Sequence, residues 1–292
     1  MIKEKLYVWS CDYSNKTGEG NLARLFTKEV NKRFNLLIKT PDNIPLKNKL
    51  FSYKYCSPFI GVFFCWYSFL SKKKTCYINY LPMWNFILFL FLPPKTILGP
   101  VTGGSNYKNS GNFIRKFLFP IFYKISEFIL IFRKSDIIFA TDLLKKSLSK
   151  TILKKSKFNF IFKAYNPKKP KKKNIDFVIY YRKHANKEKF FPKNFVSNIV
   201  KKKYKIHIIG DYLNIKGVKN HGRVSQNKIN MLLSKSKYSI GSGENLYTLF
   251  TLDCINNNVK IFIDKNISQR TSKFKKYFKK INFESKKIFS YF

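Results

Sequence analysis

The chain is poor in acidic residues. It has 15 Asp and Glu against 58 Lys and Arg, which gives a formal net charge of +43. A charge of this size attracts polyanions such as nucleic acid and anionic lipid headgroups. However, the lysines are spread along the whole chain, and the composition favours residues that A/T-rich codons encode. Because most aromatic residues lie in apolar runs rather than between basic residues, we expect no nucleic-acid partner.

Cysteines are few, and their spacing suggests no pairing. There are five, an odd number, without a Cys-x-x-Cys pair and mostly inside apolar runs. We therefore expect buried thiols in a reducing compartment. Residues 1–9 do not show the charged start, apolar stretch and small-residue cleavage site of a secretory signal. The expected location is cytoplasmic.

Several common catalytic and metal-binding signatures are missing. The sequence has no Walker loop, no Gly-x-Ser-x-Gly elbow, no Asp-x-Asp and no Cys/His pair in a known context. His184, His207 and His221 do not have the spacing of metal ligands. We expect neither a metal nor a cofactor.

Two long stretches, residues 55–71 and 75–94, carry almost no charge. The second is long enough to raise the question of a membrane-spanning helix, but Pro82, Asn85 and the Pro93-Pro94 pair interrupt it. Instead of a membrane-spanning helix, we expect a strand at residues 76–80, a short helix at 84–92 and a second strand at 96–99.

Strand and helix patterns alternate along the chain, which is typical of parallel sheets with helical crossovers. In the first half we expect strands at residues 5–10, 35–39, 76–80, 96–99 and 136–140, and helices at 21–33 and 113–132. In the second half we expect strands at 177–181, 205–209, 238–241 and 260–263, helices at 226–235 and 247–256, and a helical tail. A lysine- and proline-rich linker at 166–175 separates the halves. The predicted fold is α/β, with two Rossmann-like domains, 1–165 and 176–292, that face a cleft.

Two glycine-rich loops follow expected strands of the first half. Thr17-Gly18-Glu19-Gly20-Asn21 lies between the opening strand and a helix. Glycine lets the backbone approach a ligand, and the free amides at a helix start favour negative groups. A tight turn capped by Asn or Thr is the alternative. The second loop, residues 98–104, includes Gly103 and Gly104, and a purely structural turn explains it equally well.

Charged residues follow two expected strands of the second half. Arg182 directly follows the strand at 177–181, and Lys187 comes five residues later. Two fixed cations can stabilise the charge on a leaving diphosphate without a metal, although such a pair is common by chance in a lysine-rich chain. Glu244 and Asp253 lie nine residues apart around an expected helix start. A helix-capping Glu and an exposed Asp are the alternative there.

These four segments resemble the group 1 retaining glycosyltransferases of GT-B architecture, a type found in bacterial polysaccharide biosynthesis, and the resemblance covers nearly the whole chain. It implies three catalytic residues, with Arg182 and Lys187 on the donor diphosphate and Glu244 on the donor sugar. It also implies donor-binding positions Gly18, Glu19, Gly20, Asn245, Leu246, Tyr247 and Asp253, and acceptor-side positions Gly103 and Gly104. The family has a second Glu eight residues after the first, whereas here the second acid is Asp253, nine residues on. Asp253 is therefore expected at the ribose hydroxyls.

The residues and the resemblance together predict a glycosyltransferase. It would transfer a sugar from a nucleoside diphosphate sugar to a hydroxyl of a glycan or lipid-linked acceptor, with retention of configuration and without a metal. The acceptor would bind to the first domain and the nucleotide sugar to the second. A two-domain sugar-nucleotide epimerase and, from a different class, a basic nucleic-acid-binding protein are the alternatives.

Lysines and aromatic residues concentrate around residues 51–74 and 113–134. The second stretch can form a helix with apolar and basic positions, which suits a peripheral location at the inner face of the membrane. Core helices with solvated lysines are the alternative.

Overall fold

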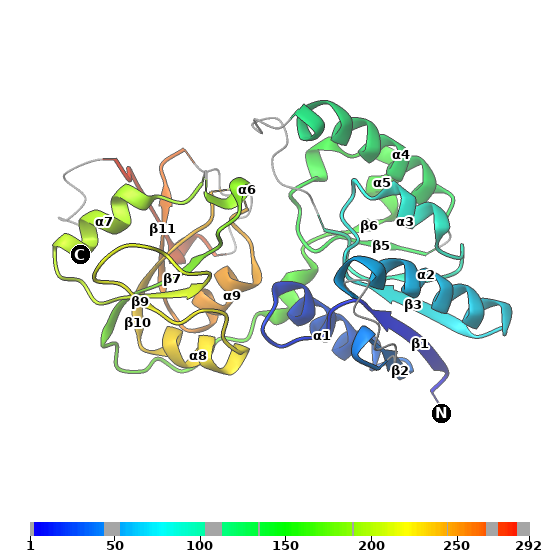
Figure 1. Ribbon diagram of the computed structural model, residues 1–292, viewed down its shortest axis with the longest axis horizontal. Helices are drawn as coiled ribbons and strands as arrows, with labels where there is room; N and C mark the ends of the chain where they lie inside the picture. Colours follow the sequence, from blue (N-terminus) through cyan, green and yellow to red (C-terminus); the bar gives the residue numbers. More distant parts are fainter. Residues whose placement is uncertain are drawn as a thin grey trace. The chain divides into compact units, whose positions relative to one another are not determined.

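The computed structural model describes residues 3–43, 53–102, 113–133, 135–188, 190–243, 245–266 and 274–284. The chain forms two compact units, Met1–Lys163 and Ala164–Phe292. Each unit contains a sheet with helices packed around it (Figure 1). Every strand pair in the described residues is parallel. The predicted α/β class with two Rossmann-like units is confirmed.

The main sheet of the first unit has the strand order β2-β1-β3-β4. Its strands are β1 (Lys5–Ser10), β2 (Asn35–Lys39), β3 (Lys74–Ile78) and β4 (Ile97–Leu98). A bridge between Val101 and Phe139 continues it toward the small sheet of β5 (Ile137–Ile138) and β6 (Ser156–Lys157). The helices are α1 (Gly18–Val30), α2 (Tyr53–Leu70), α3 (Phe86–Phe91), α4 (Phe119–Ile131) and α5 (Lys150–Lys155).

The central strands of this sheet are apolar because both of their faces are covered, as in other parallel sheets. In β1, Leu6 and Val8 belong to one buried cluster and Trp9 to another. Ile78 of β3 joins the first cluster and Tyr77 joins the second. Side chains alternate between the two faces of a strand, so one short segment contributes to two cores.

The sheet of the second unit has the strand order β12-β11-β10-β7-β8-β9. Its strands are β7 (Ile175–Tyr181), β8 (Ile206–Gly210), β9 (Lys219–Asn220), β10 (Ser236–Ile240), β11 (Lys260–Asp264) and β12 (Phe278–Ile281). The helices are α6 (Ala185–Glu188), α7 (Lys193–Lys201), α8 (Gln226–Ser234) and α9 (Leu249–Asn256). The chain builds outward from β7 through β8 to β9 and then returns to add β10 on the other side of β7. The strand order therefore reverses between β7 and β10, where open α/β sheets bind their ligands.

The helical tail predicted for the end of the chain is wrong where the structure describes it. Phe278–Ile281 form the edge strand β12, which pairs in parallel with β11. Ile281 is buried in the core of the second unit. Pairing with the open edge of β11 satisfies its backbone groups, and this tertiary contact outweighs local helix propensity. Residues 267–273 and 285–292 lie outside the described part.

Residues 166–175, predicted as a linker, belong to the second unit, whose first residue is Ala164. The Asn166 amide donates to Oδ1 of Asn256 at 2.8 Å, and the Lys168 amide donates to its carbonyl oxygen at 2.7 Å. All five cysteines are free; four of them are buried, as predicted, whereas Cys56 is only partly buried. Among the described residues, no helix has both the length and the apolar character needed to cross a membrane.

Candidate functional site

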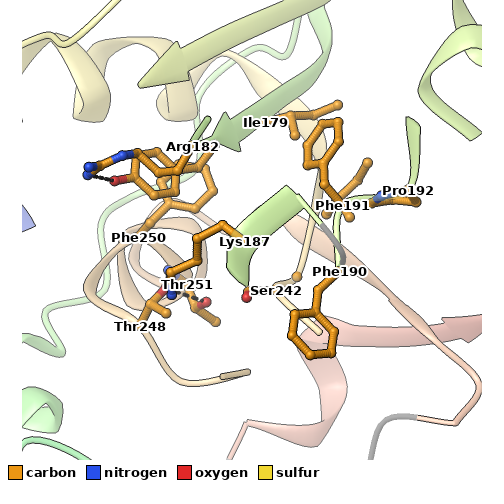
Figure 2. A pocket seen from close by; sticks show the side chains of 13 residues that line it. Ile179, Arg182, Lys187, Phe190, Phe191, Pro192, Ser242, Thr248, Phe250 and Thr251 are labelled. Atoms are coloured by element: carbon orange, nitrogen blue, oxygen red, sulfur yellow. Dashed lines mark hydrogen bonds between the residues drawn. The ribbon is translucent and has the colours of Figure 1, made fainter. Parts of the chain in front are cut away.

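A pocket lies at the reversal point of the second sheet, where β7 and β10 end (Figure 2). Arg182 and Lys187, which follow β7, line it together with Gly241 and Ser242, which follow β10. The start of α9 supplies further lining residues, Thr248, Phe250 and Thr251. The site thus combines two cations with a helix N-terminus at the carboxyl edge of a parallel sheet.

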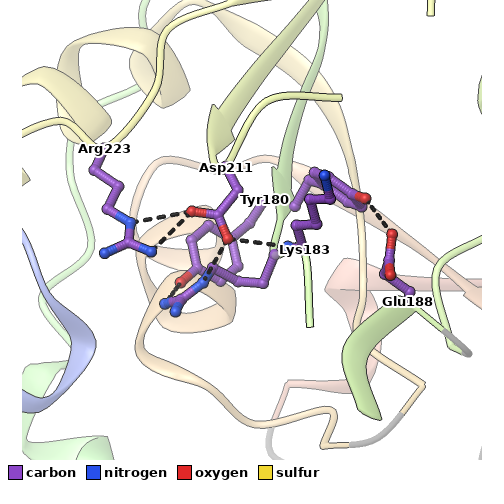
Figure 3. A network of polar contacts seen from close by, with 7 residues as sticks. Tyr180, Lys183, Glu188, Asp211 and Arg223 are labelled. Atoms are coloured by element: carbon purple, nitrogen blue, oxygen red, sulfur yellow. Dashed lines mark hydrogen bonds and ion pairs between the residues drawn. The ribbon is translucent and has the colours of Figure 1, made fainter. Parts of the chain in front are cut away.

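Arg182 is held by the carboxylate of Asp211, which follows the neighbouring strand. Figure 3 shows Asp211 together with Arg223. Its Nε donates to Oδ2 of Asp211 at 3.2 Å, and its Nη1 donates to the Tyr180 hydroxyl at 3.2 Å. The Lys183 amide donates to the same Oδ2 at 2.9 Å, while Arg223 approaches Oδ1 of Asp211 at 3.0 Å. Asp211 is in reach because it follows β8, which pairs with β7.

Opposing effects act on the ionisation of Asp211. Partial burial by itself raises the pKa of this carboxyl, but the Lys183 amide and the guanidinium groups of Arg223 and Arg182 outweigh that effect. The pKa of Asp211 therefore lies below its ordinary value. The carboxylate stays charged at neutral pH and restricts the orientation of Arg182 beside the pocket.

A second contact fixes the short helix that carries Lys187. The Tyr181 hydroxyl, at the end of β7, donates to Oε1 of Glu188 at 2.6 Å. Glu188 is the neighbour of Lys187 in α6, so this bond ties α6 to the strand end. In Figure 2 the Lys187 side chain extends toward Thr248 and Thr251 at the start of α9.

The third part of the site is the N-terminus of α9. Thr248 is its N-cap and accepts a hydrogen bond from the Thr251 amide at 3.1 Å. The first turn of a helix directs backbone N–H groups outward and carries a partial positive charge, which favours phosphate groups. No acidic residue lies in the first turn of α9, so the anion-binding potential of this end is not neutralised there.

Comparisons with solved structures find matches over most of the chain, all at low sequence identity. Neither a model of a known protein family nor a curated protein matches the sequence. A UDP-GlcNAc 2-epimerase from Methanocaldococcus jannaschii, solved with UDP-GlcNAc and UDP, is 10% identical over 97% of this chain and 89% of its own, with a TM-score of 0.48. A glycosyltransferase from Rickettsia africae is 11% identical over 91% of this chain and 80% of its own, with a TM-score of 0.47.

UGT2 from Phytolacca americana, solved with UDP-2fluoro-glucose and pterostilbene, is 8% identical over 90% of this chain and 80% of its own, with a TM-score of 0.47. At such identities, and with TM-scores below 0.5, these alignments carry no argument about activity.

The structure brings together two of the residues singled out in the sequence, Arg182 and Lys187, in one pocket. Of the neighbouring donor-binding candidates, Leu246 and Tyr247 have buried side chains, and the Tyr247 ring packs on Phe278. Their side chains therefore face the core rather than a ligand. Asn245 is partly buried. Glu244, Gly103 and Gly104 lie outside the described residues, and their roles stay predictions.

Asp253 is not among the residues that line this pocket. It lies in α9 with its Oδ2 accepting a hydrogen bond from Nε2 of Gln226 at 2.7 Å. Burial raises the pKa of Asp253 to about 6, in spite of the hydrogen bond from Gln226 and the charge of Lys168. Asp253 is thus a partly buried acid in the helix whose start lines the pocket, and its expected role with ribose hydroxyls stays a prediction.

The loop with Gly18, Glu19 and Gly20 belongs to the first unit, at the start of α1. A Cβ on Gly20 would lie 2.1 Å from the Ser14 carbonyl oxygen, so close backbone packing by itself explains that glycine, whereas a Cβ on Gly18 would meet nothing within 4 Å. Burial is the main cause that raises the pKa of the Glu19 carboxyl above its ordinary value. The Glu19 carbonyl oxygen accepts a 2.7 Å hydrogen bond from Asn79, which follows β3.

Sequence reasoning missed Asp211 and left Arg223 without a role. Asp211 lies 29 residues after Arg182 in the chain, and only the pairing of β7 with β8 makes them neighbours. The available signal was an acid immediately after a strand predicted at 205–209, in a chain with few acids. Strand order, which the sequence did not provide, was needed to use that signal.

Proposed function

We propose that the protein is a glycosyltransferase that uses a nucleoside diphosphate sugar and binds the diphosphate in the pocket of the second unit. One observation supports this proposal above all others. Arg182, Lys187 and the N-terminus of α9 meet at the point where the strand order of a Rossmann-like sheet reverses. Two cations and a helix start are suited to the charge and shape of a diphosphate.

The chemical role follows from where charge develops. When the bond between the sugar and the diphosphate breaks, negative charge gathers on the leaving diphosphate. Arg182 and Lys187 would stabilise that charge, and Asp211 would keep the guanidinium of Arg182 in place for it. The resemblance further implies that the sugar retains its anomeric configuration. The diphosphate would then depart from the same face of the sugar that the acceptor hydroxyl attacks. We assign no general base.

The proposal places the acceptor, a glycan or a lipid-linked glycan, on the first unit. Glu19, also in the first unit, stays a proposed donor-side contact; its carboxyl lies near the ends of β1 and β3, and burial raises its pKa. We also propose that Glu244 contacts the donor sugar.

Metal independence is also part of the proposal. In the part of the chain that the structure describes, no group of three or more His, Cys, Asp or Glu side chains is arranged to hold a metal ion. Arg182 and Lys187 would supply the positive charge at the diphosphate instead. A nucleotide titration in excess EDTA tests metal independence together with nucleotide binding.

A thermal-shift and calorimetric titration with UDP, GDP and dTDP, each in excess EDTA, tests the proposal. We expect at least one of these diphosphates to bind and to raise the melting temperature, with about 2.7 kcal/mol of stabilisation at a ligand concentration of 100 Kd. CMP, which lacks the second phosphate, should bind more weakly. If binding required magnesium or manganese, metal independence would be wrong, and if no diphosphate bound, the function itself would be wrong.

The same nucleotide sugars distinguish a transferase from an epimerase, which would use a similar diphosphate site. A transferase releases free nucleoside diphosphate when an acceptor is present, whereas the product of an epimerase is still a nucleotide sugar. Chromatography of the nucleotide products therefore separates the two activities.

A further inference from the structure

Helix α2 is apolar on the side that faces away from its own unit. Its buried positions are small residues, including Ser57, Gly61 and Ser68. Its outward positions are large and apolar, with Phe63 75% and Leu70 73% exposed. An ordinary surface helix has the opposite arrangement, with its apolar side turned toward the core.

Helix α4 shows the same inversion. Ser126 and Glu127 are on its buried side, where Glu127 accepts a 2.7 Å hydrogen bond from the Ser149 amide at the start of α5. The outward side of α4 and its C-cap residue present Phe128, 64% exposed, and Phe132, 71% exposed. Water thus meets Phe128 and Phe132, whereas Ser126 and Glu127 face the protein beside Tyr123 and Leu130.

Helix α3 connects these two helices into one surface. The indole N–H of Trp66 in α2 donates to the Phe91 carbonyl of α3 at 2.7 Å. On its other side, Phe86 of α3 packs on Phe122 of α4 with ring centroids 5.2 Å apart. The buried Arg133, just after α4, donates to three carbonyl oxygens at the C-terminal end of α3, those of Phe89, Leu92 and Pro93. Figure 1 shows the three helices in the same region of the first unit.

We call the outward side chains of α2, α3 and α4 the outward helix face; its exposed members include Phe59, Phe63, Leu70, Leu90, Phe128 and the α4 C-cap residue Phe132. Scattered exposed apolar residues are normal on soluble proteins, but a contiguous set across three helices marks an interaction surface.

Charge indicates what covers this face. Between residues 51 and 133 the sequence contains a single acidic residue, Glu127, and that residue is buried and paired with Lys124. The lysines of the same segments, such as Lys72 after α2 and Lys116 before α4, are exposed. A second copy of the chain would bring another +43 charge and would be repelled. An anionic lipid surface matches both the apolar side chains and the surrounding lysines.

We propose that the outward helix face docks onto an anionic lipid bilayer. The phenylalanines and leucines enter the boundary between headgroups and acyl chains, Trp66 lies at the level of the headgroups, and the lysines contact the anionic headgroups. This face is formed entirely by the first unit, so lipid binding does not depend on the nucleotide pocket of the second unit.

Co-sedimentation of the full chain with vesicles tests the inference. Vesicles of phosphatidylcholine with a quarter phosphatidylserine should bind the protein about tenfold more strongly than phosphatidylcholine alone, and high salt should weaken this binding. Vesicles with brominated acyl chains should quench tryptophan fluorescence, because Trp66 and Trp84 lie on or beside the outward helix face and are partly exposed. An absence of binding to anionic vesicles at low salt would overturn the inference.

A variant and a matched control identify the surface. The double substitution Phe63→Ser and Phe128→Ser should lower vesicle binding by about tenfold or more, because both rings point outward. Met231→Ser, which changes an exposed apolar residue of α8 in the second unit, should leave vesicle binding unchanged. Equal binding of the double variant and the wild type would contradict the assignment. So would sedimentation velocity showing a dimer that the double substitution dissociates, since the face would then cover a second copy.

The nucleotide titration separates this inference from the proposed function. The double variant should keep the far-ultraviolet circular dichroism of the wild type and its response to nucleoside diphosphate. Vesicle binding by a protein that binds no nucleotide would support the docking face and contradict the transferase proposal.

Discussion

Arg182→Ala and Lys187→Ala are each expected to lower turnover of the nucleotide sugar by about 100-fold or more, with the fold intact. Each substitution would remove one charged contact to the diphosphate that we propose binds in the pocket that both side chains line. Because the charge on the diphosphate is larger in the transition state than in the bound substrate, the loss should appear mainly in kcat. Steady-state kinetics with the nucleotide sugar that the titration identifies would measure it.

Lys183→Ala is the matched control for this pair. It removes one positive charge next to Arg182, but its exposed side chain is not among the residues that line the pocket. Turnover of this variant should stay within about threefold of the wild type if position rather than total charge matters. Wild-type turnover in Arg182→Ala and Lys187→Ala, or an equal loss in all three variants, would reject the site.

Asp211→Asn should lower kcat by about tenfold, because Arg182 loses a charged partner and keeps only neutral hydrogen bonds. Asp211 is a positioning residue, since its carboxylate contacts Arg182 and Arg223. The affinity for nucleoside diphosphate should change far less than kcat, since removal of a negative charge near the site also strengthens attraction of the anion. A comparison of kcat with the Kd of the diphosphate measures this split.

Asp176→Asn provides the control at the opposite end of the same strand. Asp176, near the start of β7, accepts hydrogen bonds from Lys237 at 2.8 Å and from the Lys205 amide at 2.9 Å, so its surroundings resemble those of Asp211. Asp176→Asn should lower the stability of the fold about as much as Asp211→Asn does, but it should leave kcat unchanged. If both variants lost the same turnover, Asp211 would have a structural role alone.

Much of the fold could be predicted because its strands are short and the central ones are buried. Lys5–Ser10 and Asn35–Lys39 begin and end where the sequence predicts, and Arg182 follows β7 as expected. In a parallel α/β sheet, the residue after a strand lies at the ligand-binding edge whatever the neighbouring strands are. Arg182 and Lys187 could therefore be placed without knowledge of strand order.

Features that depend on neighbours could not be predicted in this way. The pairing of Asp211 with Arg182 requires β8 to lie beside β7, and β12 forms only because β11 offers an open edge. The composition of residues 113–132 predicts an apolar helix but not which side of it faces the protein. Only the structure shows Ser126 and Glu127 turned inward and Phe128 turned outward.

Hydrogen exchange followed by mass spectrometry, with and without saturating nucleoside diphosphate in EDTA, tests the central assignment most directly. The bound diphosphate should slow amide exchange in peptides that cover residues 181–188 and 241–251, because these segments surround the pocket. Arg182→Ala should weaken that protection at the same ligand concentration. Slowed exchange confined to other segments, or no change at a concentration where calorimetry shows binding, would contradict a diphosphate site between β7 and β10.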